Sequence, residues 1–217
     1  MTSPEKWAAE TARIIIESRS LYTRITGDPF YFSSGWASPV FIDCKKLISD
    51  PPSRNDLAEM TVAHISTSVD VDTLDAVAGC ELTGVPFATL IADRLSKPLV
   101  LVCKQRKGFG RLAQFEGSFE PGARVLLVDD LATDGVSETA FRTALQRAEA
   151  TVLDTFVLID FDVFPTNHTY LSLAKLSHII EAAKESGYLG AKDVAEIENF
   201  ARDAPAWSRL HGGIGGL

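Results

Sequence analysis

The chain has 217 residues, of which 46% are hydrophobic and 23% charged, proportions that exclude a disordered, collagenous or coiled-coil protein. A chain of this length buries enough surface to form one compact core without disulfide cross-links. Its formal net charge of −8 argues against a surface that holds nucleic acid or an anionic membrane by bulk charge. A small anionic ligand needs only a local positive site, so that class of ligand stays open.

The cysteines and the hydropathy pattern indicate the compartment. Cys44, Cys80 and Cys103 are odd in number and lack CxxC or zinc-binding spacing, which is typical of reduced thiols in a cytosolic protein. The N-terminal residues do not have the pattern of a signal peptide, and no apolar run approaches the ~20 residues that span a bilayer. We therefore expect a cytoplasmic protein that binds neither membrane nor nucleic acid.

The first 50 residues predict a helix and a small hood. Ser3, Pro4 and Glu5 form a helix-start signature, and the apolar residues after them predict a helix over residues 4–18. Residues 30–47 hold two β-rich pieces, as expected of a hairpin or an extended arm. A second helix is expected over residues 54–69.

Strands and helices alternate from residue 74 onward. The predicted strands are residues 74–80, 98–104, 123–131 and 152–164, and the predicted helices between them are residues 85–96 and 137–150. Such alternation is the signature of an α/β fold with a central, mostly parallel sheet, here of five strands, flanked by helices. We expect a single domain over residues 1–217, with its α/β core at 70–165 and a helical C-terminal extension at 166–217.

The segment VLLVDDLATDGVS, residues 125–137, carries the strongest functional signal. An apolar strand delivers Asp129 and Asp130 at its carboxyl end, where open α/β sheets bind their ligands. The following turn opens a helix, and its backbone N–H groups suit a phosphate. Carboxylates accept hydrogen bonds from sugar hydroxyls, so the pattern favours a ribose 5-phosphate. The structural alternative is a helix-capping pair followed by an ordinary turn.

This segment resembles the signature with which type I phosphoribosyltransferases bind phosphoribosyl pyrophosphate (PRPP). The resemblance extends to the orotate branch of that family through GDPFYFSSGWASPVFIDCKKLISDP and AGCELTGVPFATLIADRLSKPLVLVCKQRKGFG, and so covers residues 27–137. It implies the type I phosphoribosyltransferase fold. It also implies transfer of the 5-phosphoribosyl group from PRPP to orotate, which gives orotidine 5′-monophosphate and pyrophosphate in pyrimidine biosynthesis.

The resemblance assigns roles to three loops. It implies that Asp129 and Asp130 bind the ribose, while the 5′-phosphate is bound by Thr133, Asp134, Gly135, Val136 and Ser137. The pyrophosphate loop would be Glu81, Leu82, Thr83 and Gly84, with a strained peptide between the first two. The basic lid that closes over PRPP would be Lys104, Arg106, Lys107 and Arg111.

The implied reaction is a substitution at the anomeric carbon of ribose. Lys104 and Lys107 join Asp129 and Asp130 as expected catalytic residues, because positive charge is needed where the leaving pyrophosphate gains negative charge. Mg²⁺ is the implied cofactor, and substrate oxygens and water would hold it rather than direct protein ligands. A homodimer is implied as well, because the family's lid reaches into the neighbouring subunit.

The side of the site that would hold the base departs from the family's usual pattern. Small, apolar or aromatic residues replace commonly basic or histidine positions at Ser33, Trp36, Cys103, Phe109 and Phe161. We assign the base pocket to Ser33, Trp36, Val40, Phe41 and Phe161. Because a buried orotate carboxylate needs a cationic or N–H partner, two alternatives stay open. One is a phosphoribosyltransferase for another nucleobase, and the other is a non-catalytic regulator that senses PRPP or a nucleotide.

Overall fold

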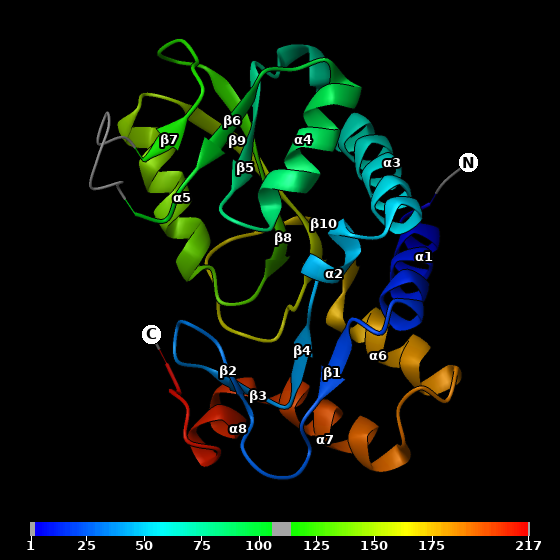
Figure 1. Cartoon of the computed structure of the whole chain (residues 1–217). Coiled ribbons are helices and arrows are strands. Elements are labelled where there is room, and N and C mark those ends of the chain that lie inside the picture. The colour runs from blue at the N-terminus through cyan, green and yellow to red at the C-terminus, as the bar shows by residue number, and fades with distance from the viewer. Residues whose placement is uncertain (1–2, 106–113, 217) are drawn as a thin grey trace.

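The computed structural model describes residues 3–105 and 114–216. The strands of its main sheet are β5 Ala76–Cys80, β6 Leu99–Val102, β7 Phe115–Glu116, β8 Arg124–Ala132, β9 Thr151–Asp160 and β10 Leu171–Lys175. They lie in the order β10-β9-β8-β5-β6-β7 (Figure 1). All neighbouring strands are parallel except the short β7, which pairs antiparallel with β6 at one edge.

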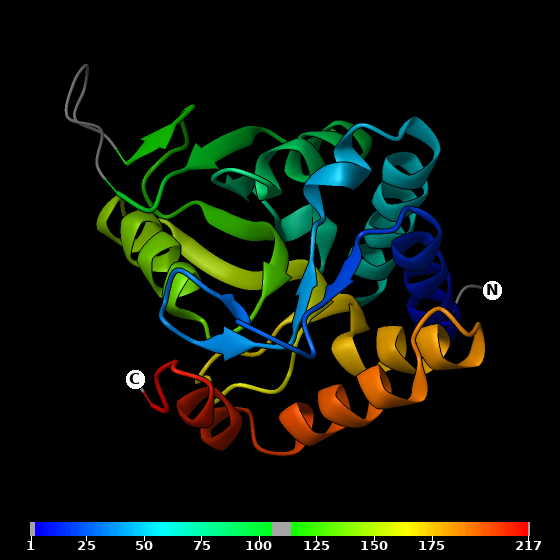
Figure 2. The ribbon, with the colours of Figure 1, turned by 60° about the horizontal axis from the view of Figure 1, so that its bottom comes forward.

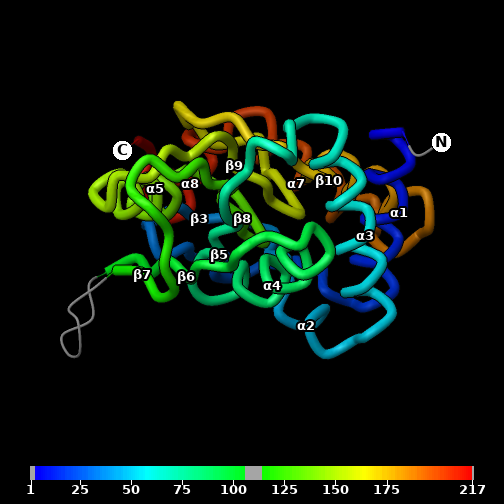
Figure 3. Tube along the Cα trace, turned by 90° about the horizontal axis from the view of Figure 1, so that it is seen from above, coloured from blue at the N-terminus to red at the C-terminus, as the bar shows by residue number. Residues whose placement is uncertain are grey.

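Helices cover both faces of this sheet. Their bounds are α1 Pro4–Glu17, α2 Lys45–Ile48, α3 Pro51–Ser68, α4 Gly84–Leu95, α5 Val136–Arg147, α6 Leu176–Glu185, α7 Ala191–Arg202 and α8 Ala204–Leu210. Figures 1 and 3 show α4 and α5 on opposite sides of the strands, with α3 beside α4 and α1 beyond α3. Along β8, Leu126 and Val128 join the core under α4, while Val125 and Leu127 join the core under α5. Both faces of the sheet are therefore buried.

The predicted α/β core is confirmed, with corrections at its ends. The sheet has six strands instead of five, and two of them, the antiparallel edge strand β7 and β10, were not among the predicted strands. The region after residue 165 was expected to be helical, but it contains β10, whose Leu173 and Ala174 are buried against the core. The strand expected over residues 152–164 ends at Asp160, shortly before Asp162 adopts a left-handed φ of 49°.

The hood consists of two small antiparallel pairs. Its strands are β1 Leu21–Thr23, β2 Phe30–Tyr31, β3 Ala37–Ser38 and β4 Val40–Ile42, and the pairs are β1 with β4 and β2 with β3. The hairpin expected within residues 30–47 is therefore present as β2 and β3. The pairing of β4 with β1 was not expected, because no strand was predicted before residue 30.

The C-terminal extension packs on this hood. The Ala37 N–H donates to Ser208 Oγ at 3.0 Å, the Ile214 N–H donates to the Gly35 carbonyl at 3.0 Å, and α8 lies beside β2 and β3 (Figure 2). The C-terminal residues thus hold the hairpin of β2 and β3 in place. None of the helices in residues 3–105 and 114–216 is long and apolar enough to cross a membrane.

Candidate active site

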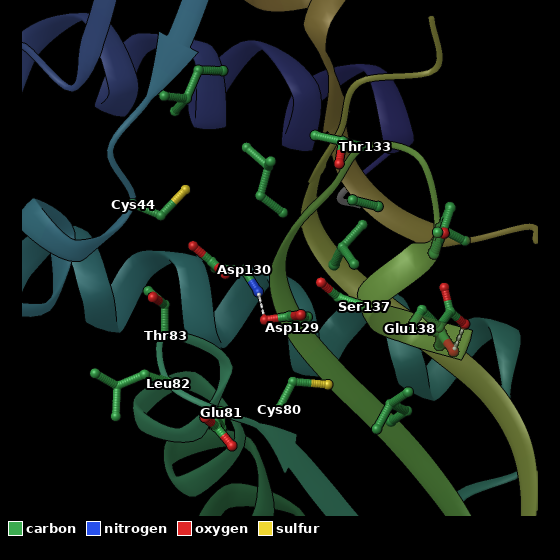
Figure 4. A pocket seen from close by; sticks show the side chains of 18 of the residues that line it. Cys44, Cys80, Glu81, Leu82, Thr83, Asp129, Asp130, Thr133, Ser137 and Glu138 are labelled. Carbon is green, nitrogen blue, oxygen red and sulfur yellow. Dashed lines mark hydrogen bonds between the residues drawn. The ribbon is translucent and has the colours of Figure 1, made fainter. Parts of the chain in front are cut away.

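A cavity of about 290 Å³ opens at the carboxyl ends of β5 and β8, where the hood meets the sheet (Figure 4). Open α/β sheets bind ligands at this edge because the loops after the strands meet there. The cavity is lined by residues 41–45 after the hood, 80–83 after β5 and 129–135 at the end of β8, together with Lys104, Ser137, Glu138, Thr155 and Tyr170. The sequence-predicted acidic pair and both predicted loops thus come together in one place.

Asp129 and Asp130 lie half-buried on the cavity wall near the end of β8. The Asp130 N–H donates to Asp129 Oδ1 at 2.9 Å, which fixes the orientation of the first carboxyl group (Figure 4). Burial raises the pKa of Asp129 well above its usual value, and the nearby charge of Asp130 raises it further. Burial also raises the pKa of Asp130. The pair is therefore stabilised by a proton, a cation or the hydroxyl donors of a sugar.

Two thiols lie against this acidic pair. Cys44 approaches Asp130 from the hood, and Cys80 approaches Asp129 from the end of β5 (Figure 4). Burial raises the pKa of both thiols, and the negative charges of the two aspartates act in the same direction. The cysteines therefore stay protonated at neutral pH, which excludes a thiolate nucleophile at these positions.

The predicted phosphate turn, residues 133–137, joins β8 to α5. Gly135 has a left-handed φ of 78° and is the N-cap of α5, where it has no side chain to cap the helix. Asp134 Oδ1 accepts the Val136 N–H at 3.1 Å and so shapes the turn. Thr133, Asp134, Gly135 and Ser137 line the cavity, whereas the Val136 side chain is exposed beside a second hollow behind the turn. The remaining N–H groups at the start of α5 are available to an anion.

Residues 165–170 brace this turn from behind, a contact that the sequence did not reveal. A Cβ at Gly135 would lie 2.6 Å from Thr166 Oγ1 and 2.7 Å from His168 Cδ2. His168 Nε2 also lies 2.9 Å from Thr139 Oγ1 on the first turn of α5. Residue 135 must therefore be glycine for two reasons: its φ is left-handed, and residues 165–170 lie too close to leave room for a Cβ.

The predicted pyrophosphate loop, residues 81–84, joins β5 to α4. The Glu81–Leu82 peptide bond is cis, at the position where the resemblance implied a strained peptide. Thr83 is the N-cap of α4, lines the cavity and makes no side-chain capping bond. The turns that begin α4 and α5 thus flank the acidic pair, one on each side (Figure 4).

Two cations line the cavity among the described residues, Lys104 and Lys45. The Lys104 N–H donates to Glu81 Oε2 at 3.0 Å, which ties the start of the predicted lid to the pyrophosphate loop. Lys45 was missed by the sequence analysis, although its position directly after the hood segment was a usable signal. The other predicted lid residues, Arg106, Lys107 and Arg111, and the family departure at Phe109 lie outside the described residues.

A model of the phosphoribosyl transferase domain matches residues 50–166, more than half of the chain. The chain belongs to the phosphoribosyltransferase family. The orotate phosphoribosyltransferase of Roseobacter denitrificans is 36% identical over 215 residues, which are 95% of each chain. The crystal structure of orotate phosphoribosyltransferase from Aeropyrum pernix is 27% identical and covers 82% of this chain and 99% of its own, with a TM-score of 0.65. UMP synthase of Leishmania donovani shares the fold, with a TM-score of 0.75 at 21% identity over 89% of this chain, which spans 42% of that longer chain.

The structure of this phosphoribosyltransferase contradicts most of the base pocket that was assigned from the sequence. Phe41 lines the cavity, but Ser33 is exposed elsewhere on the hood. Trp36, Val40 and Phe161 are almost fully buried and belong to the hydrophobic core. The Trp36 ring packs 4.9 Å from that of Phe164, so it faces the core and is not exposed for stacking on a base. Side chains alternate between the two faces of a strand, which explains why Phe41 lines the cavity. Its neighbours in β4, Val40 and Ile42, point inward, so Phe41 points outward.

Proposed function

We propose that this phosphoribosyltransferase transfers the 5-phosphoribosyl group of PRPP to orotate and so makes orotidine 5′-monophosphate and pyrophosphate for pyrimidine biosynthesis. The observation that carries the proposal is the acidic pair between the turns that begin α4 and α5, in one cavity. That arrangement suits a ribose with an anionic group at each end. The choice of orotate is supported by the full-length similarity to proteins named orotate phosphoribosyltransferase.

The turn before α5 would hold the 5′-phosphate, and Asp129 and Asp130 would accept hydrogen bonds from the ribose hydroxyls. The substrate is then fixed at both ends of the sugar, and the anomeric carbon lies between them. A ring nitrogen of orotate forms the new bond to that carbon and loses its proton to solvent, while the diphosphate leaves with the electron pair of the broken bond. The loop before α4 and the lysines Lys104 and Lys107 would stabilise the charge that builds on the leaving oxygens.

The residues of the cavity fit a hydrated Mg²⁺ carried by PRPP. The carboxylate oxygens of Asp129 and Asp130 lie half-buried with too little positive charge around them, so they suit a hard cation at their side. Among the described residues no three His, Cys, Asp or Glu side chains group together to hold a metal. The ion, when bound, would neutralise part of the diphosphate charge.

We further propose that the active form is a homodimer in which each lid serves the neighbouring site. The family resemblance supports this arrangement, and the start of the lid at Lys104 lies at the edge of the cavity. Light scattering of the purified protein tests the dimer directly.

The proposed reaction is tested by incubating the protein with PRPP, Mg²⁺ and a panel of nucleobases and measuring pyrophosphate release. We expect release with orotate and formation of orotidine 5′-monophosphate. Release with a different base alone would assign another substrate. Binding of PRPP without turnover on any base would support a sensor of PRPP and would overturn the enzymatic proposal.

A further inference from the structure

The charge balance of the cavity is unfavourable for its proposed substrate. Among the described residues the lining side chains include only two cations, Lys45 and Lys104, and six acids, which are Asp43, Glu81, Asp129, Asp130, Asp134 and Glu138. PRPP carries a phosphate and a diphosphate, so it brings several further negative charges into this acidic site. Each described cation that faces the cavity is therefore important for binding and for catalysis.

Lys45 is the cation on the hood side. It is the first residue of α2 and follows Cys44, which lies against Asp130 on the same side of the cavity as Leu82 and Thr83 (Figure 4). Its backbone N–H donates to Asp43 Oδ1 at 3.2 Å, and its exposed side chain forms no ion pair with the described residues. The positive charge of Lys45 partly offsets the effect of burial on the pKa of Asp130, as expected of a cation close to the acidic pair.

The next residue, Lys46, has a different environment. Its Nζ donates to the Arg19 carbonyl at 2.8 Å and to the Tyr22 hydroxyl at 3.1 Å, and it lies 5.3 Å from the centre of the Tyr22 ring. Lys46 is absent from the cavity wall. The two adjacent lysines thus differ in their contacts: Lys46 joins α2 to the hood, while Lys45 lines the cavity and has no ion pair with the described residues.

The position of Lys45 favours the diphosphate over the other substrate groups. The 5′-phosphate belongs to the turn before α5, which lies across the acidic pair from Thr83 (Figure 4). The loop before α4 offers uncapped N–H groups but no cation, and its Glu81 is an acid. A diphosphate at this loop therefore needs positive charge from outside the loop. Lys104 follows β6 and supplies positive charge on that side of the loop only, which leaves the hood side to Lys45.

We propose that Lys45 contacts the diphosphate of PRPP and, together with Lys104, stabilises the charge that develops on it as it leaves. This assignment rests on the proposed phosphoribosyl transfer and adds a residue to its leaving-group side. As the bond from the anomeric carbon to the diphosphate oxygen breaks, the electron pair moves to that oxygen, and the lysine ammonium compensates it without giving up its proton.

The test compares Lys45→Ala and Lys45→Arg with the control Lys46→Ala. Calorimetry measures the binding of pyrophosphate and of ribose 5-phosphate, each with Mg²⁺, and steady-state kinetics measures kcat and both KM values. We expect Lys45→Ala to weaken pyrophosphate binding and lower kcat/KM for PRPP by about 10- to 100-fold, the loss of one charge-assisted hydrogen bond. Binding of ribose 5-phosphate and the KM for orotate should change less than about twofold. Lys45→Arg should recover most of the loss, and Lys46→Ala should behave as the wild type.

Two results would overturn the assignment. If Lys45→Ala raised the KM for orotate and left pyrophosphate binding unchanged, the lysine would serve the carboxylate of the base instead. If Lys45→Ala matched Lys46→Ala in every measurement, Lys45 would have no role in the site. The KM for orotate depends on the proposed function, but pyrophosphate binding does not, because it is measured without a base. Absence of orotate turnover in the wild type would therefore refute the function and leave the assignment of Lys45 testable by pyrophosphate binding.

Discussion

Gly84 at the start of α4 lies directly against Asp129 of β8. A Cβ at residue 84 would approach Asp129 Oδ1 to 2.9 Å and the Val128 carbonyl oxygen to 2.6 Å. Both neighbours are held in place, the carbonyl by the sheet and the carboxyl group by the Asp130 N–H. The proposed pyrophosphate loop and the acidic pair are therefore one rigid unit, in which a change in one displaces the other.

Gly84→Ala tests this contact. The added methyl group would push the loop away from β8, and we expect a loss of about 1–3 kcal/mol in the free energy of unfolding, as is usual for overpacking. The same shift should lower kcat/KM by at least about tenfold, because it moves the acidic pair and the diphosphate loop together. Gly190→Ala is the control for stability, since a Cβ at that exposed glycine would meet only Asp193 Oδ2, at 3.8 Å, and its φ of −71° suits any residue. Wild-type activity in Gly84→Ala would disprove the rigid contact.

The acidic pair makes stability depend on pH. The pKa of Asp129 is raised in the folded state, so the folded protein binds more protons than the unfolded chain between the usual value of 3.8 and the raised value. The free energy of unfolding therefore falls as pH rises through that window. Asp129→Asn removes the titrating group but keeps an acceptor for the Asp130 N–H, so it should be more stable than the wild type at pH 7–8. The difference should shrink toward pH 4, as measured by urea denaturation at several pH values, and a constant difference would contradict the raised pKa.

The brace behind the phosphate turn predicts a selective defect. Gly135→Ala forces a β-carbon into a left-handed backbone position and against Thr166 and His168. We expect a loss of about 2 kcal/mol or more in the free energy of unfolding. Affinity for ribose 5-phosphate should fall by more than about tenfold, while affinity for pyrophosphate stays within about twofold. Calorimetry with the two ligands distinguishes this result from general unfolding, which would reduce both affinities equally.

The proposed dimer predicts complementation between two inactive variants. Asp130→Asn should weaken the binding of the ribose, whereas Lys107→Ala should mainly lower kcat, because its interaction is made in the transition state. If the lid acts across subunits, a mixed dimer has one site with an intact acidic pair and an intact partner lid. Equal amounts of the two variants, unfolded and refolded together, should then recover about a quarter of the wild-type activity. Recovery of none would mean that each lid serves its own subunit.

The sequence by itself determined the chemistry of the sheet's carboxyl edge. The apolar run before Asp129 and Asp130 predicts a buried strand, and the turn after it needs a glycine with a left-handed backbone, so local sequence was enough to place both. The order of strands and helices over residues 74–160 is likewise local, because each element has its own periodicity. In the same way, the turn after β5 follows directly from the end of an apolar strand.

Tertiary structure alone decided which side chains face the cavity. Trp36 and Phe161 were assigned to the base pocket because they occupy positions that commonly hold basic residues in the family, but packing against the core turned both away. Lys45 and Lys46 are indistinguishable in the sequence, yet one lines the cavity and the other binds the hood. The charge on the cavity wall depends on which side chains a short helix or strand turns toward the cavity. Contacts between residues far apart in the chain, such as those that join α8 to β3, set that orientation.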